Sequence, residues 1–157
     1  MKLLNLLKLA KQACLSAALF LSFVQTLHAF GVGQFIYTDK QKIKPQMEIV
    51  GKTNASIFVG ANEDKGVLRV AQDLQRDILA VTGQTLKIEH DWRKVSGNSI
   101  IIATVEHSDL LKQLQASSKI DLSSIKNQWD GYQIQLIEDI STKVTKALVI
   151  AGSNKRG

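Results

Sequence analysis

The chain has 157 residues, a net charge of +6 and one cysteine, Cys14. Three lysines among the first 29 residues carry half of that charge, and the other cations are scattered among acidic residues. This distribution argues against nucleic-acid binding, which needs cations gathered on one surface. Because no cysteine follows Cys14, residues 30–157 can form neither disulfides nor thiolate metal sites, and nothing in them predicts a cofactor.

The N-terminal segment has the pattern of a secretory signal peptide. Three lysines precede an apolar run over residues 13–24, and a cleavage point lies near Ala29. The run is shorter than the ~20 residues that a transmembrane helix needs, although an uncleaved membrane anchor is the alternative. We therefore expect a secreted or periplasmic protein in which residues 1–29 are the signal peptide and residues 30–157 form one domain.

The first part of this domain offers three short strand candidates. A mixed apolar patch at residues 35–37 could form an edge strand, and residues 47–50 are a second candidate. A turn is predicted at residues 51–54, since glycine and asparagine tolerate its backbone angles. The apolar run at residues 57–59 then predicts a strand that leads into a helix.

That helix, over residues 66–83, has the clearest pattern in the chain, with apolar residues three and four positions apart. Asn62 is expected to cap it, with Glu63 and Asp64 near the positive end of its dipole. Gly83 is expected to end it in the left-handed conformation. The positions predicted to face the core are Val67, Val70, Ala71, Leu74, Ile78 and Val81.

The remaining elements follow in the order strand, strand, helix, strand, strand. Residues 85–89 alternate polar and apolar, and residues 99–103 form a continuous β-branched run typical of a central strand. Ser108 is expected to cap a helix to about residue 117, and residues 132–136 and 147–151 are expected to form an antiparallel pair. The inward-facing residues of that helix are Leu110, Leu111 and Leu114.

This order of elements predicts an α/β fold, a two-layer sandwich in which helices pack on a mixed β-sheet. A turn at residues 152–157 follows the last buried strand, and no further element comes after it. We therefore expect the domain to be C-terminally incomplete.

No set of residues has the spacing of a catalytic or metal site. His90 and His107 are interpreted as surface or loop residues. Glu63 and Asp64 could form a carboxylate pair for glycoside hydrolysis. Stabilisation of the helix dipole is the better explanation for both.

Two other features could bind a ligand. Trp92 and Trp129 could stack on a sugar ring, although packing over the edge of the sheet is the more frequent outcome. The turn at residues 152–157 could bind a carboxylate through its backbone N–H groups and the Lys155-Arg156 pair. Its alternative role is a simple connection.

Four segments, taken together, carry a resemblance: residues 61–83, residues 99–103, Trp129-Asp130-Gly131-Tyr132, and AGSNKRG over residues 151–157. They resemble the N-terminal domain of glycoside hydrolase family 115, the xylan α-glucuronidases. Members of this family remove glucuronic or 4-O-methylglucuronic acid from glucuronoxylan, using a (β/α)8 barrel that follows this domain. The resemblance implies no catalytic residue here. It implies that Asn154, Lys155 and Arg156 either shape the acidic-sugar pocket or fix the turn against the barrel.

The sequence thus predicts the non-catalytic N-terminal domain of a secreted α-1,2-glucuronidase, inactive alone. Its partners would be the absent barrel of the same polypeptide and, through the full enzyme, glucuronoxylan; a homodimer of the full-length form is compatible with this. Two alternatives stay open. One is a stand-alone exported carbohydrate-binding or interaction module, and the other is an accessory domain of a hexosaminidase-like glycosidase.

Overall fold

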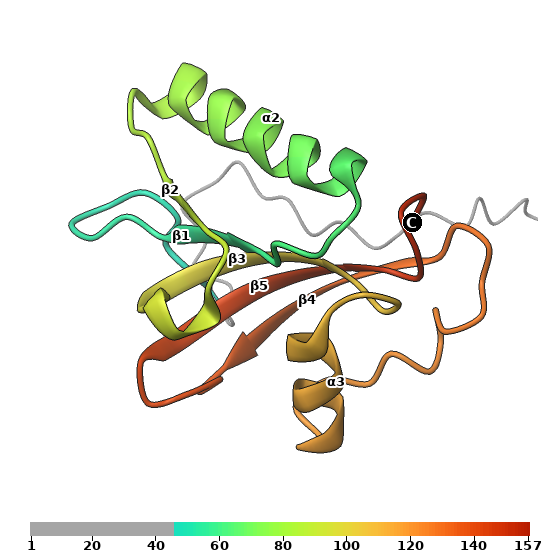
Figure 1. Cartoon of the computed structure of the whole chain (residues 1–157). Helices are drawn as coiled ribbons and strands as arrows, with labels where there is room; N and C mark the ends of the chain where they lie inside the picture. Colours follow the sequence, from blue (N-terminus) through green and yellow to red (C-terminus); the bar gives the residue numbers. More distant parts are fainter. Residues whose placement is uncertain (1–45) are drawn as a thin grey trace, which may run out of the picture. The chain divides into compact units, whose positions relative to one another are not determined.

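The computed structural model describes residues 46–157, so the expected signal peptide and the strand candidate at residues 35–37 lie outside the described residues. A mixed five-stranded sheet in the order β2-β1-β3-β5-β4 forms the centre of the fold (Figure 1). Four strands run parallel, and β4 pairs antiparallel with β5. The strands are β1 (Ser56–Val59), β2 (Lys87–Glu89), β3 (Gly97–Thr104), β4 (Tyr132–Glu138) and β5 (Val144–Gly152).

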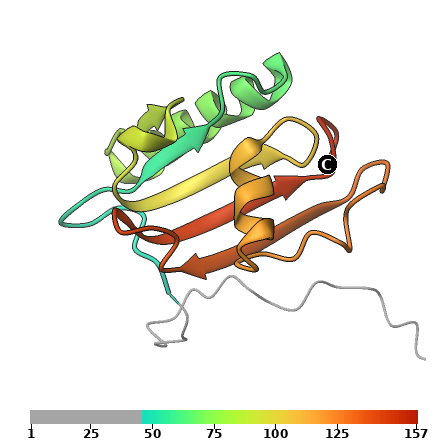
Figure 2. The same cartoon turned by 60° about the horizontal axis from the view of Figure 1, so that its bottom comes forward.

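The predicted fold class, an α/β sandwich with helices packed on a mixed sheet, is confirmed. Helix α2 (Lys65–Thr82) and helix α3 (Asp109–Ala116) lie on opposite faces of the sheet (Figures 1 and 2). A short 3-10 helix, η1 (Trp92–Lys94), precedes β3. The order of strands and helices along the chain is also as predicted from residue 57 onward.

Each face of the sheet carries its own apolar core, because successive strand side chains point to opposite faces. On β1, Ile57 and Val59 pack with α2, whereas Phe58 packs with α3. The core on the α3 side is the larger one. Its fully buried members include Ile101, Leu111, Leu122 and Val149.

The face that α2 buries is narrower than predicted. Val67 and Ala71 are buried, and Leu74 and Ile78 are half-buried against the core. The prediction was wrong for two other positions, since Val70 is 55% and Val81 is 85% exposed. Leu68 packs on the core in addition, which shows that the helix is rotated about its axis relative to the predicted stripe.

The end of α2 was predicted correctly and its start was not. Gly83 has φ of 71° and its N–H donates to the Leu79 carbonyl (2.8 Å). Asn62 does not cap the helix. The residue before the first turn is Asp64, whose side chain makes no capping bond, and the Asn62 amide donates instead to the His107 carbonyl (2.9 Å).

The predicted strand at residues 47–50 is absent from the sheet. Its backbone carbonyls bond elsewhere: the Glu48 carbonyl accepts from the Asn98 amide (2.9 Å), and the Ile49 carbonyl from the Ala55 N–H (2.8 Å). The apolar side chains of this segment still pack against the α2-side core. The segment is therefore a loop that packs on the α2-side core and contacts the start of β3, without pairing to the sheet.

The second helix and the final strand pair agree with prediction. Ser108 Oγ accepts a hydrogen bond from the Leu111 N–H (3.2 Å), and the three leucines of α3 are buried. β4 and β5 form the expected antiparallel pair. Both β3 and β5 extend beyond their predicted bounds, because pairing between them continues to Gly97 at one end and Gly152 at the other.

Candidate functional site

The parallel strands end together at one edge of the sheet, and the loops that follow them gather there (Figure 2). The loop after β1 leads to α2 on one face, and the loop after β3 leads toward α3 on the other. Loops that leave a parallel sheet in opposite directions open a crevice, which is where open α/β sheets bind ligands.

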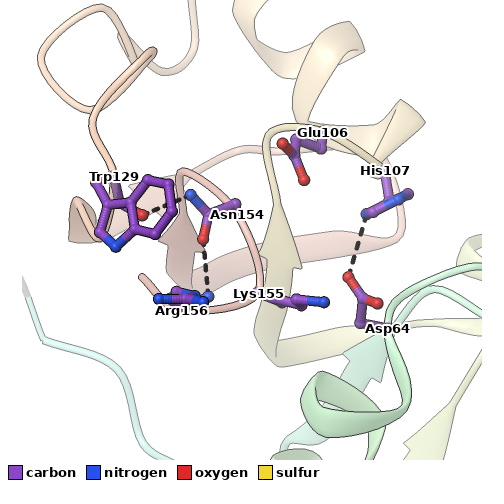
Figure 3. Close-up of a pocket in the computed structure, with 7 residues that line it drawn as sticks. All are labelled: Asp64, Glu106, His107, Trp129, Asn154, Lys155 and Arg156. Atoms are coloured by element: carbon purple, nitrogen blue, oxygen red, sulfur yellow. Dashed lines mark hydrogen bonds and ion pairs between the residues drawn. The ribbon is translucent and has the colours of Figure 1, made fainter.

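An open cavity of about 410 Å³ lies at this edge. Four segments distant in sequence form its wall: the loops after β1, β3 and β5, and the loop before β4 (Figure 3). The lining residues are Asp64, Glu106, His107, Trp129, Asn154, Lys155 and Arg156.

The turn after β5 is held in a tight conformation. A Cβ atom on Gly152 would lie 2.8 Å from the Asn154 carbonyl oxygen and 2.9 Å from that of Gly157, so a side chain there would collide with backbone. The Ser153 N–H donates to the Gly131 carbonyl (2.7 Å), which ties the turn to the start of β4. The position of Lys155 and Arg156 is therefore set by the backbone around them.

Asn154 joins this turn to Trp129. Its Oδ1 accepts from the Arg156 N–H (2.9 Å), and its Nδ2 donates to the Trp129 carbonyl (2.6 Å). The Arg156 guanidinium carbon lies 4.7 Å from the centroid of the Trp129 ring, within the range of a cation–π contact. These three residues form one structural unit at one end of the cavity (Figure 3).

The two tryptophans differ from each other. Trp92 packs against Phe58, with ring centroids 5.2 Å apart, as expected for a structural tryptophan. The expectation of packing over the sheet was wrong for Trp129, which is 70% exposed because its loop carries it away from the sheet to the cavity.

At the other end of the cavity, the lining residue Asp64 follows a buried carboxylate, that of Glu63. Glu63 is 5% exposed, and its two oxygens accept from the Thr104 N–H (2.9 Å) and the Thr104 hydroxyl (2.7 Å). The explanation by the helix dipole was therefore wrong for Glu63, because its partner is the end of β3.

His107 and Asp64, which line the cavity, make longer contacts next to the Glu63–Thr104 hydrogen bonds. His107 Nδ1 lies 3.8 Å from Asp64 Oδ2 and 3.3 Å from Thr104 Oγ1. Together with the bond from Asn62 to the His107 carbonyl, these contacts fasten the loop after β1 to the loop after β3. These contacts hold residues 60–64 and 104–108 next to each other at this end of the cavity.

The charged residues of the cavity differ in whether they have a partner of opposite charge. Asp64 and His107 face each other, whereas, within residues 46–157, no carboxylate pairs with Lys155 or Arg156. Among the described residues, nothing acidic therefore competes with an anion for these two cations. Groups with shifted pKa lie outside the cavity: the Arg93 guanidinium lowers the pKa of Asp91, and the Ser123 N–H lowers that of Asp121.

Within the described part of the chain, no three His, Cys, Asp or Glu side chains are placed to hold a metal ion. None of the helices between residues 46 and 157 is long and apolar enough to cross a membrane. His90 lies apart from the cavity, with Nδ1 2.9 Å from the Val59 carbonyl oxygen.

Of the predicted site residues, the structure brings Asn154, Lys155 and Arg156 into one cavity and adds Trp129. The sequence matches no known family profile and no curated protein. The resemblance to family 115 therefore stays a prediction from the motifs.

Proposed function

We propose that this chain is a non-catalytic binding domain for acidic sugars, and that it forms part of a secreted enzyme resembling the xylan α-glucuronidases. The observation that carries the proposal is the convergence of an exposed indole, Trp129, with two cations, Lys155 and Arg156, that have no carboxylate partner among residues 46–157. An aromatic surface suits the apolar face of a sugar ring, and a guanidinium suits a uronate carboxylate.

The geometry lowers the cost of binding. Asn154 holds the Arg156 backbone and the Trp129 carbonyl at fixed positions, so less conformational freedom is lost when a ligand arrives. Arg156 lies over one face of the Trp129 ring, and the side chain still remains largely exposed. A sugar ring and its carboxylate can thus contact both residues at once.

The test is calorimetric titration of the chain with xylotriose carrying one 4-O-methylglucuronic acid, compared with unsubstituted xylotetraose. We expect the acidic oligosaccharide alone to bind. Arg156→Ala should weaken it about 10- to 100-fold, the value of one lost charge-assisted hydrogen bond. Lys94→Ala, which removes an exposed lysine on η1 outside the cavity, is the matched control and should change nothing.

Equal binding of both oligosaccharides, or full affinity in the Arg156→Ala variant, would refute the proposal. Release of glucuronic acid by the chain alone would refute its non-catalytic part. In that case Asp64 and Glu106, the two carboxylates of the cavity, would be the residues to substitute.

A second candidate function, docking of a catalytic barrel, is favoured by an apolar surface on the α2 side of the sheet. Val70 is 55%, Tyr132 59% and Ile134 45% exposed. Ile134 pairs in register with Ile150, which lines an open groove of about 240 Å³ together with Val70. Mixing the chain with a separately produced family 115 barrel, and measuring complex mass by light scattering, tests this role. A complex that Ile134→Thr weakens is expected, and absence of a complex counts against docking.

A further inference from the structure

The hydrogen bonds between Glu63 and Thr104 have a fixed direction. The Thr104 hydroxyl lies 2.7 Å from Glu63 Oε2, and an ionised carboxylate only accepts, so the hydroxyl donates its single proton to Glu63. The other carboxylate oxygen accepts from the Thr104 N–H at 2.9 Å. Because both residues are buried, water has little access to rearrange these bonds.

This direction determines where the neighbouring imidazole of His107 carries its hydrogen. Thr104 Oγ1 lies 3.3 Å from His107 Nδ1. The hydroxyl proton points to Glu63, so Thr104 Oγ1 can only accept from His107, and Nδ1 must carry a hydrogen. Asp64 Oδ2, 3.8 Å from the same nitrogen, also favours an N–H there. A neutral His107 therefore has its hydrogen on Nδ1 and a lone pair on Nε2.

The nitrogen with the lone pair is accessible to a ligand. His107 lines the cavity of about 410 Å³, and its side chain is 41% exposed. Figure 3 shows the second ring nitrogen on the side of the ring away from Asp64. Within residues 46–157, Nε2 has no hydrogen-bond partner, and it is not buried. The charged residues that line the cavity with His107 are Asp64, Glu106, Lys155 and Arg156.

We propose that His107 Nε2 accepts a hydrogen bond from a hydroxyl group of the ligand, and that the buried Glu63 fixes this polarity through Thr104. The contact rests on the proposed function, in which the carboxylate of an acidic sugar binds at Arg156, at the opposite end of the cavity. His107 is then a ligand-binding residue. Glu63 and Thr104 are positioning residues, because they act on the ligand only through the proton position of His107.

Nuclear magnetic resonance of the ¹⁵N-labelled chain tests the proton position without any ligand. At about pH 8 a histidine side chain is normally neutral, and its protonated and bare nitrogens have clearly separated ¹⁵N shifts. His90 is an internal reference, because its Nδ1 lies 2.9 Å from the Val59 carbonyl oxygen, which can only accept. We expect His90 and His107 both to carry the hydrogen on Nδ1.

A substitution of Glu63 should reverse the polarity. In Glu63→Gln the side-chain amide can donate to Thr104 Oγ1, which leaves the Thr104 hydroxyl free to donate to His107. The hydrogen of His107 should then move to Nε2, while the signals of His90 stay unchanged and show that the variant is folded. Thr104→Ser keeps the hydroxyl and is the matched control, in which His107 should resemble the wild type.

The contact with the ligand is tested by titrating methyl glucuronoside and its 2-, 3- and 4-deoxyfluoro analogues in the same samples. Fluorine removes the hydroxyl proton and adds little volume. One analogue should bind the wild type about 3- to 10-fold more weakly than the parent compound, as expected for one lost hydrogen bond. In His107→Phe, which lacks Nε2, this difference should disappear.

The outcomes distinguish this inference from the proposed function. If methyl glucuronoside does not bind, the proposed function fails and the ligand contact fails with it, whereas the ¹⁵N shifts still decide the proton position. If it binds and no analogue binds more weakly, or the difference persists in His107→Phe, the contact at Nε2 is refuted while the proposed function stands. A hydrogen on Nε2 in the wild type, or an unchanged His107 in Glu63→Gln, refutes the role of Glu63.

Discussion

Replacing Glu63 by alanine removes the bond that fastens the loop after β1 to the end of β3. Both carboxylate oxygens of Glu63 accept from Thr104, one from its N–H at 2.9 Å and one from its hydroxyl at 2.7 Å. Glu63 and Thr104 are 5% and 2% exposed, so water cannot replace the lost acceptor freely.

The expected cost follows from these two bonds. A hydrogen bond to a charged group contributes about 1.5–3 kcal/mol, and a buried donor left unpaired costs about 1–3 kcal/mol. Part of this is offset because the variant no longer buries a carboxylate. We therefore expect Glu63→Ala to lower the free energy of unfolding by about 3 kcal/mol.

Two further variants separate the contributions of the two Thr104–Glu63 hydrogen bonds to this loss of stability. Thr104→Val keeps the backbone N–H and loses the hydroxyl, and should cost about 1.5 kcal/mol, the lower value for one bond to a charged group. Glu63→Gln keeps an acceptor for the N–H, while its amide can donate to the Thr104 oxygen, so it should cost about 1 kcal/mol. Urea unfolding, followed by the fluorescence of Trp92 in its contact with Phe58, measures all three.

A decrease in the free energy of unfolding of less than about 1 kcal/mol for Glu63→Ala would contradict this prediction, because the loss of two buried hydrogen bonds without replacement should cost more. So would a Glu63→Gln variant as unstable as Glu63→Ala. The slope of the unfolding free energy against urea should stay constant across the series, since a change in slope would mean that the unfolded or native state had altered.

Two other predictions concern backbone conformation and charge. Gly83→Ala should lower the free energy of unfolding by about 1 kcal/mol, because Gly83 has φ of 71°. Gly66→Ala, in the first turn of α2, should raise it by about 0.4–1 kcal/mol, because nothing lies within 4 Å of the added Cβ. Thermal unfolding compares the two variants, and a change of the same sign in both would contradict this prediction. The Arg93 guanidinium lowers the pKa of Asp91 from 3.8 in the folded chain, so the pair stabilises above that value and its contribution is lost as the pH falls through the lower, folded pKa. The stability difference between wild type and Asp91→Asn, measured from pH 7 downward, should therefore vanish in strong acid; a difference independent of pH would count against the pair.

Features with a local signal were predictable from the sequence. Ser108 caps α3 through the Leu111 N–H three residues on, and Gly83 ends α2 through a conformation that glycine favours. The strands were recognised because burial on both faces leaves continuous apolar runs, as in residues 99–103. These signals depend only on a few neighbouring residues, which a single sequence contains in full.

Features that depend on distant partners were not predictable. Asn62 and Glu63 look like residues of a helix start, yet their hydrogen bonds reach the His107 carbonyl and Thr104, more than 40 residues away. Val70 is apolar at a helical spacing, but it is 55% exposed because it lines an open groove opposite Ile150 of β5. A periodic pattern predicts which face is apolar, and only the neighbouring elements decide how much of it is covered.

The candidate site shows the same division. The Lys155-Arg156 pair could be chosen from the sequence, because cations in a glycine-bounded turn suit an anion. Nothing in the sequence connected that turn to Trp129, which the Asn154 amide joins to it across 25 residues.

The position of β5 in the sheet has a consequence for synthesis. It lies between β3 and β4 and pairs with both, although it is the last of these five strands to leave the ribosome. Until then β3 has an open edge with its continuous isoleucine run exposed. At a synthesis rate of about 5–20 residues per second, the interval from Thr104 to Gly152 lasts several seconds. We expect the nascent chain to remain unfolded and prone to strand-mediated association during that time, and to depend on chaperones that hold it extended.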